Sequence, residues 1–193
     1  MLATHSREMG AQTMKTRAMI LAGSMLALSG SDIPFTSAPV EAQPRRAASL
    51  CAANETPLFQ CRVGRKMAAV CGGRSGGRTY AQYRFGRPGA LELTYPNSRN
   101  GSGTLRRASI PFSGGGEAQF HFTSGNHQYV VFSRTVRTSF GAGGNNPEFS
   151  AGVTVRRNGR VLRTLGCSDG DSANVDLGAA ERFIPEGEPV QAD

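Results

Sequence analysis

Residues 117–122 read EAQFHF, so polar and apolar side chains alternate strictly along this stretch. A period of two is typical of a β-strand that turns one face to a protein core and the other face to water. The stretch therefore predicts a strand in which Phe120 and Phe122 are buried. The polar residues predicted to face solvent are Glu117, Gln119 and His121.

The same alternation recurs in residues 81–85, 91–95 and 153–156. Each stretch predicts another strand with one apolar face, and in the first of them Gln82 and Arg84 are assigned to the solvent side. A chain that repeats this pattern so often, without a sustained helical period, is typical of an all-β protein.

Short turn signals separate these strands. Asn158-Gly159 is the pair that a type I′ hairpin favours, and Gly64-Arg65 closes a hairpin between two cysteines. The predicted strands are residues 57–63, 66–71, 79–86, 90–95, 105–112, 117–123, 127–135, 151–157 and 160–166. Even spacing with local turns predicts an all-β, disulfide-stabilised antiparallel meander of about eight or nine short strands, closed as a small barrel or folded as a sandwich.

Residues 1–42 have the pattern of a Sec-type signal peptide. The positive segment 14–17 precedes the apolar residues 18–28, which are too few for a membrane span of about 20 residues. Cleavage is predicted after Ala42, with a site after Ser29 as the alternative and the methionine of the positive segment as an alternative start. No cysteine stands where a lipoprotein would be lipidated, so we expect a periplasmic or extracellular protein without an integral membrane span.

Composition divides the rest of the chain into three parts. Residues 43–50 are predicted to be a linker, residues 51–167 the β-domain, and residues 168–193 an acidic, largely flexible tail with a short helix over 176–183. We expect this single domain to be a monomer, because nothing in its length requires more than one core.

The four cysteines, Cys51, Cys61, Cys71 and Cys167, all follow the signal segment. An even number in an exported chain predicts two disulfides, for which three pairings exist. We favour Cys61–Cys71 within a hairpin and Cys51–Cys167 joining the ends of the domain. The spacings lack a Cys-x-x-Cys pair, so no metal or cofactor is predicted.

The formal net charge of +8 is unevenly distributed. Residues 43–167 hold 18 basic and four acidic side chains (+14), whereas residues 168–193 hold one basic and seven acidic (−6). The tail either shields an anion-binding surface or only keeps the chain soluble. The candidate anion-binding residues are Arg74, Arg78, Arg84, Arg87, Arg106, Arg107, Arg134 and Arg137. A partner for them is an anionic polymer (lipopolysaccharide, acidic glycan or nucleic acid), with Tyr80 as the best candidate for an exposed stacking ring.

The sequence contains only weak matches to catalytic motifs. Residues 73–77 match the Gly-x-Ser-x-Gly elbow around Ser75, but a strand is predicted after them where a hydrolase has a helix. His121 is assigned to a strand surface and His127 to the flank of a turn. We therefore predict a protein that is not an enzyme, with a serine hydrolase as the less favoured alternative.

Several motifs resemble a family of small exported bacterial proteins that has no assigned activity. They include the spacing of nine residues between Cys61 and Cys71, YRFG at 83–86 and SGGGE at 113–117. The resemblance covers about residues 51–167 and implies export without implying a particular chemistry.

The architecture is also distantly similar to small β-barrel lysozyme inhibitors of bacteria, which plug an enzyme cleft with a loop. No loop motif of those inhibitors matches this chain, and a basic body is repelled by a basic lysozyme. The sequence therefore predicts a non-catalytic, inhibitor-like binding module with an envelope protein as its partner, and polyanion binding as the alternative.

Overall fold

The computed structural model describes residues 48–99, 105–139, 141, 144, 146–170 and 172–191. The predicted signal peptide, residues 1–42, lies outside the described residues. Within the described part, no helix is long and apolar enough to cross a membrane.

All nine predicted strands are present, and several are longer than predicted. They are β1 (Thr56–Val63), β2 (Lys66–Ser75), β3 (Arg78–Arg87), β4 (Ala90–Tyr95), β5 (Arg106–Phe112), β6 (Gly115–Ser124), β7 (His127–Arg137), β8 (Pro147–Arg157) and β9 (Arg160–Gly166). The turn between β8 and β9 has positive φ at Asn158 (51°) and Gly159 (78°), as the predicted type I′ hairpin requires.

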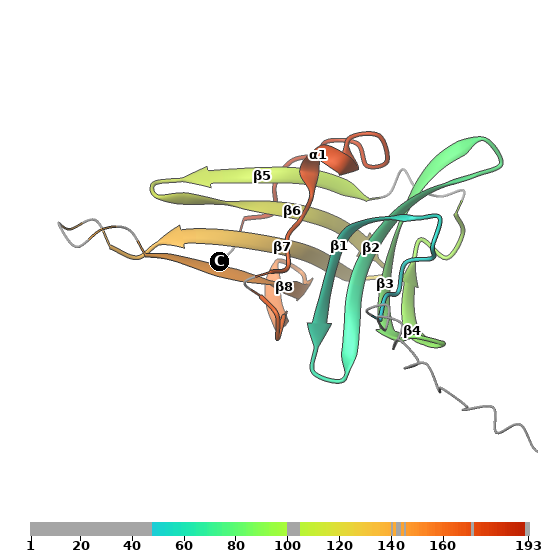
Figure 1. The fold of residues 1–193 in the computed structure, drawn as a ribbon, viewed down its shortest axis with the longest axis horizontal. Helices are drawn as coiled ribbons and strands as arrows, with labels where there is room; N and C mark the ends of the chain where they lie inside the picture. Colours follow the sequence, from blue (N-terminus) through green and yellow to red (C-terminus); the bar gives the residue numbers. More distant parts are fainter. Residues whose placement is uncertain are drawn as a thin grey trace, which may run out of the picture. The chain divides into compact units, whose positions relative to one another are not determined.

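The strands form two antiparallel sheets. Sheet A has the order β1-β2-β3-β4 and sheet B the order β5-β6-β7-β8-β9, so within each sheet every strand pairs with its neighbour in sequence. The predicted all-β antiparallel meander is therefore confirmed. The two sheets do not close into one barrel, and their strands cross each other in Figure 1, as in a sandwich with crossed layers.

The core lies between the two sheets. Phe59 and Tyr83 of sheet A share one buried cluster with Phe120 and Phe122 of sheet B, and the rings of Tyr83 and Phe122 are 5.2 Å apart. The apolar phase of the alternation is thus confirmed for these residues. Leu91, which the same pattern assigned to the core, is 46% exposed because the β3–β4 register shifts after Phe85. We call the core-facing side of each sheet its inner face and the other side its back face.

The predicted pairing of the cysteines is wrong, although all four form disulfides. The bonds join Cys51 to Cys71 and Cys61 to Cys167. Cys61 lies opposite Ala68 in the β1–β2 ladder, and Cys71 is three positions further along β2. An odd separation places Cys61 on the inner face of sheet A and Cys71 on its back face, so the two sulfur atoms cannot meet.

The predicted flexible tail is also wrong for the residues that the structure describes. Ala180 and Ile184 are fully buried in the core between the sheets. The predicted helix is present but short (α1, Leu177–Ala180), and Asp176 caps it by accepting a hydrogen bond from the Ala179 backbone at 2.8 Å. After the helix, Phe183 packs flat on Gly72, where a Cβ atom would come within 2.6 Å of the ring.

The loops that the two disulfides close differ in length, and this predicts different contributions to stability. Cys61 and Cys167 are 106 residues apart and Cys51 and Cys71 only 20. In the chain-entropy relation these loops correspond to about 4.8 and about 3.3 kcal/mol. We expect Cys61→Ala/Cys167→Ala to lower the free energy of unfolding by about 1.5 kcal/mol more than Cys51→Ala/Cys71→Ala, measured by urea denaturation. Peptide mapping without reduction that found Cys61 linked to Cys71 would refute the pairing itself.

Candidate functional site

The back face of sheet A is polar and buried. Tyr80, Gln82 and Arg84 project from β3 on this face and are 2%, 5% and 5% exposed, although the sequence placed all three in solvent. Residues 48–55, which we call the N-terminal cover, lie over them, and the disulfide from Cys51 to Cys71 holds the cover to the sheet. The prediction failed because alternation identifies the polar face without indicating what packs against it.

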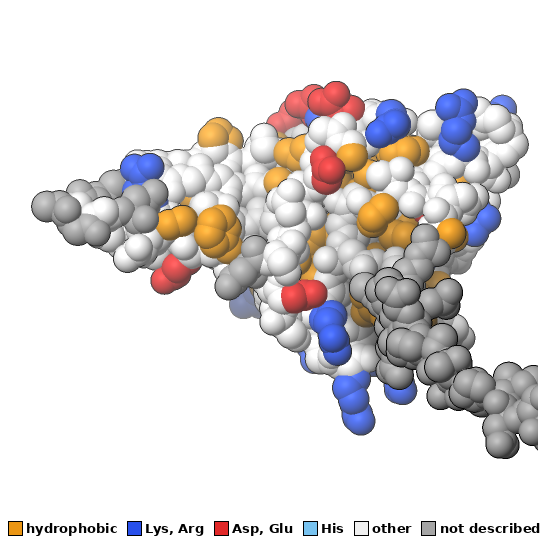
Figure 2. Space-filling view, viewed as in Figure 1, with side chains coloured by type: hydrophobic (Ala, Val, Ile, Leu, Met, Phe, Trp, Pro, Cys, Tyr) orange, Lys and Arg blue, Asp and Glu red, His pale blue; other side chains and the backbone are white. Residues whose placement is uncertain are grey.

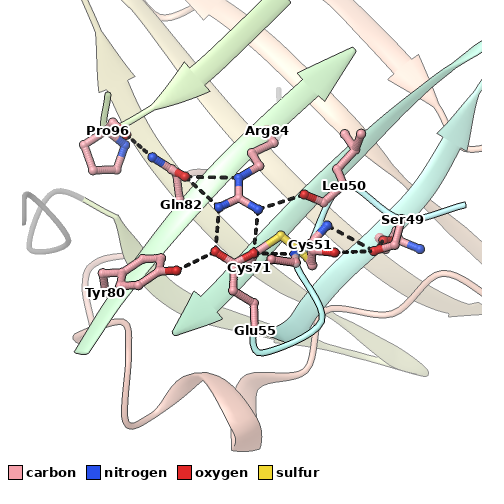
Figure 3. A network of polar contacts seen from close by, with 11 residues as sticks. Ser49, Leu50, Cys51, Glu55, Cys71, Tyr80, Gln82, Arg84 and Pro96 are labelled. Carbon is pink, nitrogen blue, oxygen red and sulfur yellow. Dashed lines mark hydrogen bonds and ion pairs between the residues drawn. A yellow bond between two sulfur atoms is a disulfide. The ribbon is translucent and has the colours of Figure 1, made fainter. Parts of the chain in front are cut away.

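Arg84 is the centre of a network between β3 and the cover (Figure 3). Its guanidinium donates hydrogen bonds to both carboxylate oxygens of Glu55, each at 2.6 Å, and to the Leu50 carbonyl at 2.7 Å. The Tyr80 hydroxyl donates to the same carboxylate at 2.5 Å. This bidentate geometry is the strongest form of an arginine–carboxylate pair, and it fixes the cover in one position.

Gln82 completes the network on the other side of the guanidinium. Its side-chain oxygen accepts from Arg84 at 2.8 and 3.0 Å, and its Nε2 donates to the Pro96 carbonyl at 2.8 Å. The segment that follows β4 is thereby tied to the same arginine as the N-terminal cover.

Protonation states follow from this geometry. Burial alone would raise the pKa of Glu55, but the hydrogen bonds from Arg84, Tyr80 and the Ala52 backbone outweigh it and lower the pKa from 4.5 to about 2. Burial and the bond to Glu55 raise the pKa of Tyr80. A carboxylate whose folded pKa is depressed stabilises the protein fully above its unfolded pKa. That stabilisation is lost as the pH falls from about 4.5 toward 2.

The network has a structural role. The hydrogen bonds that Arg84 donates go to oxygens of Gln82, Leu50 and Glu55, and its side chain is buried beneath the cover. Cys51, Glu55 and Cys71 come within 4.8 Å of one another, as do Cys61, Cys167 and Asp169, but in both groups the sulfur atoms are joined in a disulfide. A disulfide lacks the thiolate that binds a metal ion, so neither group is a candidate metal site.

The back face of sheet B is covered in the same way, by the other end of the chain. Glu117 and Gln119, predicted to face solvent, are 5% and 0% exposed. Residues 184–191, which we call the C-terminal strap, begin in the core at Ile184, pass along the edge of β5 and reach Gln119 on the back face at Val190. Gln119 donates from Nε2 to the Val190 carbonyl at 2.8 Å and accepts from the Val190 backbone N–H at 3.0 Å. Its side-chain amide therefore makes both hydrogen bonds that a neighbouring strand would make with Val190.

A hollow of about 430 Å³ lies beside the strap, and we call it the back-face groove. Its lining residues come from β6, β7, β8, β9 and the strap: Glu117, Val130, Phe132, Arg134, Thr154, Arg156, Val161, Thr164 and Val190. Arg134 forms an ion pair with Glu117 and stands 5.7 Å from the centre of the Phe132 ring. Arg156 donates to the Gln191 carbonyl at 2.6 Å. Two arginines and one glutamate give the lining a formal charge of +1 (2 − 1).

The structure does not bring the eight predicted anion-binding arginines together. Arg84 is buried in the ion pair with Glu55, Arg134 is paired with Glu117, and Arg107 contacts Glu186 of the strap at 3.5 Å. Arg106 lies against the strap as well. The other four are exposed at three separate places. Arg74 and Arg78 flank the β2–β3 turn, Arg87 precedes the β3–β4 turn, and Arg137 ends β7.

A basic cluster that the sequence did not indicate lies at one end of sheet A. Arg62, Arg65 and Lys66 line a hollow of about 360 Å³ around the β1–β2 turn, together with the acidic Asp169. The neighbouring β3–β4 turn contributes Pro88 to the lining, and Arg87 precedes that proline. Figure 2 shows basic side chains gathered at this end and others at the β2–β3 end, with acidic side chains over α1. The cluster depends on two hairpin turns meeting at one end of the sheet, which residue spacing alone does not reveal.

The remaining candidates have no catalytic arrangement. Ser75 ends β2 and is followed by the turn Gly76–Gly77 and then by β3, so the helix of a nucleophile elbow is absent at this position. His127 begins β7 directly after a turn, as predicted. His121 is half-buried beneath the strap, and burial lowers its pKa, with a smaller lowering from Arg106 and an opposing hydrogen bond at the Glu188 backbone.

Comparison of the chain with protein-family models, with curated proteins and with solved structures finds no match. The described residues also form a hollow of about 480 Å³ beside the end of β9 and one of about 300 Å³ between β2 and Phe183.

The buried ion pair predicts a large effect for a single substitution. Arg84→Met leaves the Glu55 carboxylate buried without its cation, and we expect this to lower the free energy of unfolding by about 3–5 kcal/mol in urea denaturation. The matched control is Lys66→Met, which breaks an equally short but exposed pair with Glu92, for an expected loss of about 0–1 kcal/mol. The double variant Glu55→Gln/Arg84→Met should recover part of the lost free energy of unfolding. Equal effects at the two sites would contradict the assigned role of Arg84.

Proposed function

We propose that the protein is a non-catalytic binding module that works in the periplasm or outside the cell, and that the back-face groove is its ligand site. The two disulfides support the compartment, since such bonds persist where thiols are oxidised. The signal-peptide pattern of residues 1–42 agrees with it. An inhibitor of an envelope enzyme is one kind of binding module that fits this proposal.

One observation carries the choice of the groove. It combines an apolar floor, made by Val130 and Phe132, with two arginine side chains in its walls. Its volume of about 430 Å³ falls in the range of about 300–1,000 Å³ that is usual for ligand pockets. Its walls belong to paired strands and to the strap that Gln119 holds, so the groove is formed before a ligand arrives.

The lining indicates the chemistry of the ligand. An apolar group gains free energy by covering Phe132 and Val161, and a single negative charge matches the formal +1 of the lining. Arg134 is half-buried and paired with Glu117, so a ligand anion reaches a cation that is already oriented. The site therefore favours an apolar group that carries an anionic one.

An aromatic sulfonate, anilinonaphthalene sulfonate, tests the groove directly. The chain contains no tryptophan, so Phe132→Trp places one tryptophan reporter in the floor, which is excited selectively at wavelengths where the four tyrosines do not absorb. We expect saturable energy transfer from this tryptophan to the bound dye. Thr154→Phe in the same background fills the groove and should weaken binding by roughly tenfold or more, which corresponds to about 1.4 kcal/mol.

The control for that experiment is Thr123→Phe, an exposed position of β6 that does not line the groove. It should leave the affinity unchanged. Dye binding that is equal in the Thr154 and Thr123 variants, or that is absent, would contradict a ligand site in the groove.

Polyanion binding is the second candidate, and the basic cluster of sheet A favours it. Arg62, Arg65 and Arg87 are exposed and lie near one hollow. We expect retention on heparin that falls steeply with salt, and Arg62→Ser/Arg65→Ser/Arg87→Ser should elute at a clearly lower salt concentration than the wild type. Arg74→Ser/Arg78→Ser/Arg157→Ser removes the same charge from exposed positions outside the cluster. Equal shifts for both variants would show that only net charge matters, and this would exclude a site at the cluster.

A further inference from the structure

The C-terminal part of the chain covers two of the four sheet edges. At the edge of β5, the Arg107 backbone N–H donates to the Pro185 carbonyl and Gly187 donates to the Arg107 carbonyl, each at 3.0 Å. At the edge of β1, the Asp176 N–H donates to the Leu58 carbonyl at 2.9 Å. Covered edges cannot pair with other chains, and this is a usual protection of β-proteins.

The edge formed by β9 has no such cover among the described residues. β9 is the outermost strand of sheet B, and six of its seven residues are exposed. Val161 and Leu162 are 45% and 56% exposed, which makes them two of the five exposed large apolar residues of the described chain. Leu162 also lacks a partner in the β8–β9 register, because that register shifts beside it.

The charge of β9 is one-sided. Arg160 and Arg163 flank the exposed apolar pair, and the strand contains no acidic residue. If a second copy of β9 paired with this one, it would bring arginines close to arginines, so self-association is disfavoured. The same two arginines attract a strand that carries carboxylates, so they select an acidic partner while they exclude an identical one.

The β9 edge and the back-face groove are continuous. Val161 and Thr164 belong to β9 and also line the groove. A strand added at this edge would extend the floor of the groove, and every second side chain of that strand would lie on the same face as the groove. Main-chain hydrogen bonds then supply affinity, and the groove supplies a place for alternate side chains.

Sheet B already binds an extended segment by this chemistry. The C-terminal strap pairs with the β5 edge through its backbone, and Gln119 then holds the strap on the back face through both polar groups of Val190. The strap is acidic at Glu186, which contacts Arg107. Sheet B therefore already has one edge strand, β5, whose arginine contacts an acidic extended segment, and that segment belongs to the same chain.

We propose that β9 binds an extended acidic segment of a partner protein by strand addition, with alternate side chains of that segment entering the back-face groove. This inference rests on the proposed function and names the ligand class of the same site. The partner segment is apolar at alternate positions, to cover Val161 and Leu162, and carries carboxylates opposite Arg160 and Arg163.

A set of three labelled synthetic peptides tests the proposal with the full chain. One alternates valine with glutamate, the second replaces each glutamate by lysine, and the third keeps the glutamates but has proline at its centre. We expect saturable fluorescence anisotropy with the glutamate peptide. The lysine and proline peptides should bind at least roughly tenfold more weakly, because one lacks the charge and the other the backbone donor and extended pairing.

A charge exchange makes the test specific for the strand. Arg160→Glu/Arg163→Glu should lose the glutamate peptide and gain the lysine peptide, because the charge of the edge is reversed. Both positions are exposed, so we expect the variant to fold as the wild type does. Arg74→Glu/Arg78→Glu makes the same change of charge at the β2–β3 turn and should keep the preference of the wild type.

Several outcomes overturn strand addition: no binding of the glutamate peptide, equal binding of the proline peptide, or the same loss in both charge variants. Sedimentation that showed dimers through β9 would overturn it as well. The failures are distinguishable. If the sulfonate dye enters the groove and the peptide does not bind, strand addition fails and the proposed function stands. If neither binds, both fail.

Discussion

The bidentate pair between Arg84 and Glu55 determines what surrounds sheet A. A buried arginine, here 5% exposed, requires a carboxylate partner. Glu55 belongs to the N-terminal cover, so the cover lies where Arg84 holds it. That position also brings Cys51 to Cys71 on the back face. The remaining cysteine of β1, Cys61, faces the inner side and bonds to Cys167 just beyond β9. The ion pair and the two disulfides therefore join both sheets and both ends of the domain.

In sheet B, too, a buried polar side chain holds a terminal segment on the back face, but this side chain is an amide and not part of an ion pair. Gln119 is fully buried and holds the C-terminal strap through Val190. In both sheets the polar phase of the strand alternation binds a terminal segment of the same chain. The uneven charge of the sequence has a physical counterpart here, because Glu186 of the acidic segment contacts Arg107 of the basic body. The strap leaves part of the back face of sheet B uncovered. This part is the back-face groove, and the edge of β9 with its two arginines lies next to it.

The strands, the turns and the inner core could be read from the sequence, since alternation and turn residues are local signals. The faces of Gln82, Arg84 and Gln119 could not, because the segments that cover them have no period of their own. The sequence contains part of the information on the disulfide pairing. The predicted turn at Gly64-Arg65 places Val63 opposite Lys66, and counting along both strands from there puts Cys61 and Cys71 on opposite faces of the sheet. The groove was beyond prediction, because Phe132, Thr154 and Val161 form no motif and meet only through the pairing of β7, β8 and β9.

Amide hydrogen exchange of the full chain, with and without the alternating valine–glutamate peptide, addresses the binding surface without any substitution. If β9 receives an extended segment, the backbone N–H groups of Arg160–Gly166 that point away from β8 become protected when the peptide is present. Exchange at the β1–β2 turn, Gly64-Arg65, then stays unchanged. Protection confined to that turn, or no change along β9, would contradict the account.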